Sequence, residues 1–117
     1  MMTKEEASER YQIPISILDE YESWGLCATV KQVMGIWQYD DQDLERLSTI
    51  MALHDMGFAV EEVERYMRLL LSGADTTRER LHMLERRRNA ALDEIHLKEK
   101  QLQRLDYLRY QMRGQKA

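Results

Sequence analysis

The fold is decided by residues 24–62, which read WGLCATVKQVMGIWQYDDQDLERLSTIMALHDMGFAVEE. The stretch opens with Trp-Gly, and glycine is the preferred residue just after the end of a helix. Residues 26–39 are rich in β-branched and aromatic side chains, which are typical of strands, and Met34–Gly35 predicts the hairpin turn between them. Asp40 predicts the N-cap of a helix that Gly57 ends, and another helix follows that glycine. This stretch therefore predicts a two-stranded ribbon followed by two helices.

Two short helices are expected before this stretch. Thr3 is expected to cap the first, over residues 3–10, and Pro14 to begin the second, which runs to about Trp24. In the second helix, steps of three and four residues separate two faces. The apolar face is Ile17, Leu18, Tyr21 and Trp24, and the exposed, polar and acidic face is Ser16, Asp19, Glu20 and Ser23.

A single long helix is expected from Thr76 to about Met112, because this segment contains neither Gly nor Pro. Alternating steps of three and four residues select a heptad seam, mostly apolar and completed by Arg109. A 75-residue head cannot bury such a seam alone, so a homodimeric coiled coil is the simplest arrangement. The expected dimer interface is Leu81, Leu84, Arg88, Ala91, Ile95, Lys98, Leu102, Leu105 and Met112.

The expected fold class is therefore mainly α. We expect a winged helix-turn-helix head with a small two-stranded wing over residues 1–75, a long C-terminal coiled-coil dimerisation helix over 76–113 and a tail over 114–117. Through Asp75 the chain carries 6 Lys or Arg and 15 Asp or Glu, and the rest carries 11 and 6. Winged helix-turn-helix folds usually bind DNA, but phosphate charge dominates that affinity. An acidic head therefore predicts weak binding unless its cations are focused on one face.

Other classes of protein lack support in the sequence. Cys27 is the single cysteine, so an intramolecular disulfide is excluded and a half-buried packing role is expected. No apolar run approaches the length of a membrane span, and residues 1–10, MMTKEEASER, lack the apolar core of a signal peptide, so a cytoplasmic protein is expected. His54, His82 and His96 stand apart without metal-binding spacing, so neither metal nor cofactor is expected. Nothing pairs a nucleophile with a base, so an enzyme is not expected.

A set of motif residues at fixed spacing precedes the long helix. They are Tyr21-Glu22, Gly25-Leu26, Gly35, Tyr39, Asp43-Leu44, Arg46-Leu47, Gly57-Phe58 and Glu61-Glu62. In this order they resemble the MerR family of bacterial transcription regulators. The resemblance implies an antiparallel coiled-coil homodimer, with the second helix in the major groove and the wing on the flanking backbone. Because the sequence ends at Ala117, just after the long helix, it resembles a member with no separate effector domain.

The positions that the resemblance assigns to DNA contact are atypical in this chain. Family members commonly present two arginines and an aromatic residue from the recognition helix, and here Ser16, Asp19 and Glu20 stand at those positions. The wing motif Gly-aromatic-Arg-x-Tyr has become residues 35–39, GIWQY, with Trp37 at the arginine position. The candidate DNA-binding residues are Ser16, Asp19, Glu20, Tyr21, Lys31, Gln32, Trp37, Gln38, Tyr39 and Arg46.

Two functions are open at this point. The first is a homodimeric, DNA-binding transcriptional regulator. The second is a MerR-derived interaction module that has lost DNA readout and binds another protein through Trp37 and the acidic helix face. The carboxylates of Asp19 and Glu20 are repelled by DNA phosphates, which arginines at these positions would attract. A carboxylate can, however, accept a hydrogen bond from cytosine N4. Weak binding to double-stranded DNA is therefore expected of the head.

Overall fold

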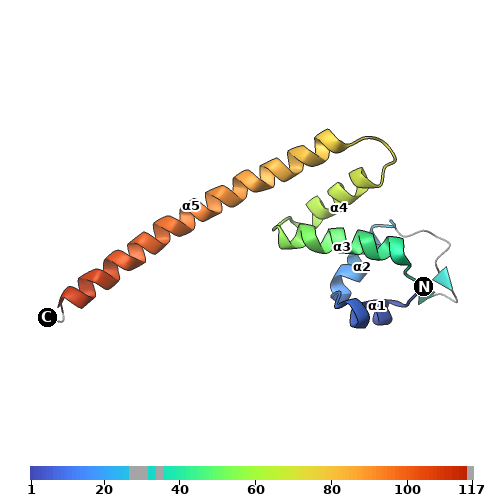
Figure 1. Ribbon diagram of the computed structural model, residues 1–117, viewed down its shortest axis with the longest axis horizontal. Helices are drawn as coiled ribbons and strands as arrows, with labels where there is room; N and C mark the ends of the chain where they lie inside the picture. Colours follow the sequence, from blue (N-terminus) through green and yellow to red (C-terminus); the bar gives the residue numbers. More distant parts are fainter. Residues whose placement is uncertain (27–31, 34–35, 116–117) are drawn as a thin grey trace. The chain divides into compact units, whose positions relative to one another are not determined.

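The computed structural model of the chain describes residues 1–26, 32–33 and 36–115. These residues divide between two units, Met1–Arg80 and the segment from Leu81 onward, which we call the head and the arm. The head holds four helices, two strands and the first turn of a fifth helix, and that helix continues through the arm (Figure 1). The elements are α1 (Lys4–Tyr11), α2 (Ile15–Ser23), β1 (Gln32–Val33), β2 (Ile36–Trp37), α3 (Asp41–Asp55), α4 (Val60–Leu70) and α5 (Thr77–Gln115).

The helix ends in the head follow the local signals in the sequence. The Thr3 hydroxyl oxygen accepts a hydrogen bond from the Glu6 backbone N–H at 3.2 Å, which confirms Thr3 as the cap of α1. At the start of α3, Asp40 and Asp43 bond reciprocally to each other's backbone N–H, which forms a capping box. Gly57 follows α3 with φ +91°, a conformation that costs glycine little because it has no Cβ.

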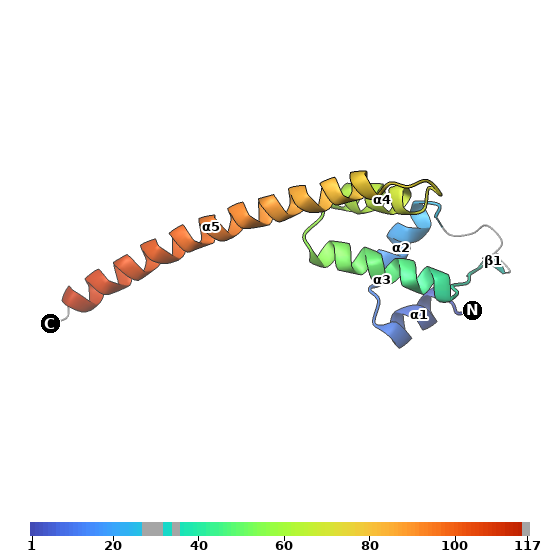
Figure 2. The same cartoon turned by 45° about the horizontal axis from the view of Figure 1, so that its top comes forward.

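The core of the head is built from one face of each of its longer helices. α3 contacts both α2 and α4, and α1 contacts α2 (Figure 2). The apolar face expected for α2 is indeed turned inward, because Leu18 and Tyr21 are fully buried and Trp24 is 7% exposed. Other buried apolar side chains are Ala7, Ile13, Tyr39, Leu47, Ile50, Leu53, Phe58, Val63 and Met67.

A short antiparallel ribbon joins α2 and α3. Gln32 pairs with Trp37, and Val33 pairs with Ile36. Met2 adds an isolated antiparallel bridge to Tyr39, with backbone N–O distances of 2.9 and 2.6 Å. The N-terminal segment of the head is thereby tied to the end of the ribbon. The expected Met34–Gly35 turn and Cys27 lie outside the described residues.

The head extends to Arg80 because the first turn of α5 is bonded to α4. The Thr76 hydroxyl donates a hydrogen bond to the Leu69 carbonyl at 2.8 Å, and the Arg80 guanidinium lies 5.9 Å from the centroid of the Tyr66 ring. This contact is a cation–π interaction. These contacts hold the first turn of the long helix against α4.

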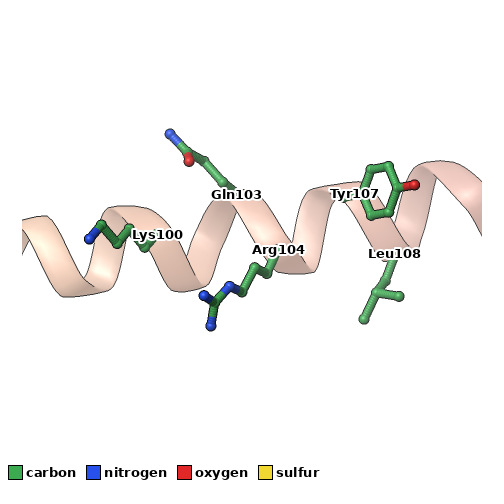
Figure 3. A pocket seen from close by; sticks show the side chains of 5 residues that line it. All are labelled: Lys100, Gln103, Arg104, Tyr107 and Leu108. Atoms are coloured by element: carbon green, nitrogen blue, oxygen red, sulfur yellow. The ribbon is translucent and has the colours of Figure 1, made fainter.

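Residues 81–115 of the arm are one uninterrupted stretch of α5, and the absence of Gly and Pro between Thr76 and Met112 predicted such a helix. The whole of α5 has 39 residues and is about 58 Å long. Figure 3 shows a shallow surface groove lined by Lys100, Gln103, Arg104, Tyr107 and Leu108. All five residues belong to α5, so this groove is the space between neighbouring side chains of one helix. Among the helices that the structure describes, none is long and apolar enough to cross a membrane.

Candidate nucleic-acid interface

The exposed face of α2 is the surface that the helix-turn-helix interpretation assigns to DNA. Ser16, Asp19 and Ser23 are exposed there, and Glu20 is half-buried. This is the polar and acidic face that the spacing in the sequence predicted. What the sequence did not indicate is that both acidic residues have partners from other helices.

Lys4 of α1 compensates the charge of Asp19. Its ammonium donates a hydrogen bond to Asp19 Oδ1 at 2.6 Å and lies 3.0 Å from Glu22 Oε2. The hydrogen bond to Asp19, and next the one to Glu22, raise the pKa of Lys4 above its ordinary value. Lys4 therefore stays cationic at neutral pH. Asp19 is not the isolated negative charge that its place in the sequence suggests.

His54 of α3 partners the second acidic residue. Its Nε2 lies 3.0 Å from Glu20 Oε2, and the two side chains are 23% and 27% exposed. His54 is therefore half-buried against α2. Within the described part of the chain, no three His, Cys, Asp or Glu side chains gather in a way that suits a metal ion.

Tyr39 connects the ribbon to the same polar cluster. Its hydroxyl donates a hydrogen bond to Glu22 Oε1, and its backbone pairs with Met2. Glu22 thus accepts from both Tyr39 and Lys4. The N-terminal segment, α2 and the end of the ribbon are held together by this one carboxylate.

A second polar network holds the inner side of α2. The buried Tyr21 hydroxyl donates to Asp43 Oδ1 at 2.8 Å. Arg46 Nη1 donates to the Leu26 carbonyl at 3.1 Å, and Arg68 Nη2 donates to the Trp24 carbonyl at 2.9 Å. The last carbonyls of a helix lack partners within the helix. Two guanidinium groups therefore donate hydrogen bonds to backbone carbonyls where the chain leaves α2. Their positive charge also interacts favourably with the negative end of the helix dipole.

Two of the candidate DNA-binding residues lie in the core of the head. Tyr21 and Tyr39 are 0% and 1% exposed, because their rings fill the core of the head while their hydroxyls bond to carboxylates. Arg46 is half-buried and bonded to the Leu26 carbonyl. The other candidates are placed as follows: Ser16, Asp19 and Glu20 on the α2 face, Gln38 half-buried after β2, Gln32 and Trp37 in the strands, and Lys31 outside the described residues.

Lys4 is the residue of this surface that sequence reasoning missed. It lies in α1, fifteen positions from Asp19, and no periodic pattern joins two residues of different helices. Its one local signal is that it is the single cation among the first nine residues. The identity of its partners depends on how α1 packs on α2.

Replacing Lys4 with Met is expected to lower the free energy of unfolding at pH 7 by about 0.5–1 kcal/mol, since partly exposed ion pairs contribute little. Because the pKa of Lys4 is raised in the folded state, its contribution is complete below the unfolded value of about 10.4 and is lost as pH rises through the folded value. Urea denaturation at pH 7 and pH 11.5 tests this prediction. A difference between wild type and Lys4→Met that is unchanged at the higher pH would contradict it.

Comparison with known proteins places this geometry in a family. Residues 2–70 match the model of the MerR HTH family regulatory proteins. This match covers more than half of the chain, and it lies over the helix-turn-helix, the ribbon, α3 and α4. The chain belongs to the MerR HTH family.

One relative by sequence is an HTH-type transcriptional regulator of Haemophilus influenzae. It is 30% identical over 84 residues, which cover 71% of this chain and 62% of that protein. This chain therefore spans somewhat less than two thirds of the relative's length. The shared segment is long enough to include the head.

Three solved structures are similar in fold. HiNmlR, a MerR family regulator lacking the sensor domain and solved bound to promoter DNA, has a TM-score of 0.67 and 27% identity, with 91% of this chain and 85% of that chain covered. A MerR family regulator from Listeria monocytogenes has a TM-score of 0.70 and 23% identity, covering 92% and 82%. One from Bacillus thuringiensis has a TM-score of 0.63 and 20% identity, covering 89% and 92%.

Proposed function

We propose that this chain is a DNA-binding transcriptional regulator that acts as a homodimer. The observation that carries the proposal is the family match over residues 2–70, which coincides with a helix-turn-helix whose second helix exposes a polar face. In such motifs the second helix lies in the major groove and the first crosses the backbone. α2 is then the reading helix, and the β1–β2 ribbon serves as the wing on the flanking backbone.

The dimer is proposed to form through α5. Along the seam, Leu81 and Ile95 are each 51% exposed, and Leu102, Leu105 and Met112 are more exposed still. A regular apolar stripe of this length on one helix is the pattern that a second helix covers in a coiled coil. The charged seam residues Arg88 and Lys98 then set the register by meeting carboxylates of the second copy.

The relative solved with DNA supports the same function. HiNmlR is described as a regulator lacking the sensor domain and bound to promoter DNA, and it resembles this chain over most of both chains. We carry DNA binding over to this chain as part of the proposal, together with a cytoplasmic, non-enzymatic role that needs neither metal nor cofactor.

Binding to the DNA upstream of its own coding region tests the proposal. In a footprint, we expect two protected half-sites related by a two-fold axis. Because few cations accompany α2, we expect log K to fall with log salt with a slope shallower than about −4, which corresponds to roughly four or fewer phosphate contacts per dimer. Gel shifts between 50 and 200 mM salt, roughly the range over which this effect is large, measure that slope.

The opposite outcome has a clear meaning. If the purified dimer shows no sequence preference at low salt on any part of that region, DNA readout has been lost. The chain would then be an interaction module, with the acidic α2 face and Trp37 as its first candidate contacts. A pull-down with wild type and with Asp19→Lys would test that role.

A further inference from the structure

The exposed face of α2 carries the carboxylate of Asp19. In helix-turn-helix proteins the N-terminal residues of the second helix contact base edges. Ile15 and Ser16 are exposed at that end of α2, and Asp19 is exposed at the middle of the helix, on the same side as Ser16. The Asp19 side chain is 57% exposed even though it is bonded to Lys4. An acceptor therefore faces outward at the place where base edges are read.

Lys4 contacts only one of the two Asp19 oxygens. The ammonium donates to Oδ1 at 2.6 Å, and an ionised carboxylate can accept several hydrogen bonds across its two oxygens. Oδ2 thus keeps the capacity to accept a further hydrogen bond. Lys4 also offsets the negative charge of Asp19, which reduces its repulsion by phosphates. With Glu22 on the same ammonium, the cluster of Lys4, Asp19 and Glu22 keeps one net negative charge.

The major-groove edge of each base decides which partner suits a carboxylate. Guanine presents the acceptors O6 and N7, and thymine presents the acceptor O4, so both repel it. Adenine presents the N6 donor beside the N7 acceptor, whereas cytosine presents the N4 donor alone. Cytosine is therefore the base that an outward carboxylate selects.

We propose that Asp19 is a base-reading residue that selects cytosine in each half-site by accepting a hydrogen bond from the N4 amino group. Lys4 is its positioning residue, since it holds the carboxylate and compensates its charge. This inference rests on the proposed DNA-binding function. It gives Asp19, which is atypical for the family, a specific role in recognising DNA sequence.

The experiment is a selection from randomised double-stranded DNA, carried out with the full-length dimer. Wild type is expected to enrich a cytosine at symmetry-related positions, and replacing that cytosine by thymine should weaken binding about 5- to 20-fold. Asp19→Asn should move the preference at this position from cytosine to adenine, because an amide pairs with adenine N6 and N7. Asp19→Ala should remove the preference at this position and leave the others intact.

Two variants separate base reading from general charge effects. Glu45→Gln removes one negative charge from an exposed position of α3, and we expect the selected sequence to be unchanged. Lys4→Met should weaken binding to all sequences and also reduce the preference for cytosine over thymine at this position, because the carboxylate is no longer held in place. Circular dichroism checks that each variant is folded, which is expected because Asp19 and Glu45 are exposed.

The outcomes distinguish the two proposals. If wild type enriches a sequence but Asp19→Ala keeps the same base at every position, the role of Asp19 is refuted and DNA binding stands. If Glu45→Gln changes the selected base as Asp19→Asn does, base reading by Asp19 is likewise refuted. If wild type enriches no sequence at all, the proposed function itself fails.

Discussion

Replacing Ile95 with Asp in the arm is expected to convert the dimer into a monomer. Ile95 lies on the heptad seam and is 51% exposed in the single chain, so the proposed partner helix must cover it. The substitution removes two apolar side chains from the interface and places two carboxylates there instead. Burying an unpaired charge is so costly that the dissociation constant should rise by roughly 10³-fold or more. Light scattering with size-exclusion chromatography measures the change.

Leu97 supplies a matched control on the same helix. It is 56% exposed, slightly more than Ile95, but lies on the side of α5 away from the seam. Leu97→Asp introduces the same charge two residues away and should leave a dimer. A dimer that survives Ile95→Asp, or one that dissociates with Leu97→Asp, would show that the seam is not the contact surface.

The effect on DNA binding should be equally large. A regulator that reads two half-sites loses most of its affinity when it becomes a monomer, because the second half-site then binds as a separate event. We expect the Ile95→Asp variant to show no protected operator at protein concentrations that saturate wild type. Leu97→Asp should protect it as wild type does.

Replacing Asp43 with Ala is expected to lower the free energy of unfolding by about 2–4 kcal/mol. Asp43 is fully buried, accepts from the Tyr21 hydroxyl and completes the capping box with Asp40. Losing the carboxylate removes a cap interaction and leaves the buried Tyr21 hydroxyl without this acceptor. Urea denaturation at a fixed protein concentration measures the loss.

Asp41 is the matched control for Asp43. It is also an acidic residue in the first turn of α3, but it is exposed. Asp41→Ala should cost less than about 1 kcal/mol, because it removes only a favourable interaction with the helix dipole. Equal losses for the two variants would mean that the buried network contributes nothing beyond charge at the helix start.

Much of the helical framework was predictable because its signals are local. Thr3, Asp40 and Gly57 mark helix ends through contacts within a few residues, and the long helix follows from the missing Gly and Pro. The inward face of α2 followed from spacing alone. Each of these features depends on neighbours along the chain, so the sequence contains the information directly.

The candidate interface was less predictable because contacts between helices define it. A tyrosine offers both a ring for the core and a hydroxyl for a polar partner, so sequence cannot tell a buried Tyr21 from an exposed one. The structure places it in the core, bonded to Asp43. The bonds from Lys4 to Asp19 and from His54 to Glu20 likewise join separate helices. Charge counted along the chain therefore overstated how negative the α2 face is.

The arginines behind α2 have a practical consequence for altering which operator is recognised. Arg46 and Arg68 donate hydrogen bonds to the carbonyls of Leu26 and Trp24, respectively, at the end of α2. Ser16 and Asp19 are exposed on its outer face. The residues that support the end of α2 are therefore different from those proposed to read DNA. A library that varies only the exposed positions of α2 should leave the arginine–carbonyl hydrogen bonds at its end intact. The head is therefore a suitable scaffold for selecting new DNA specificities.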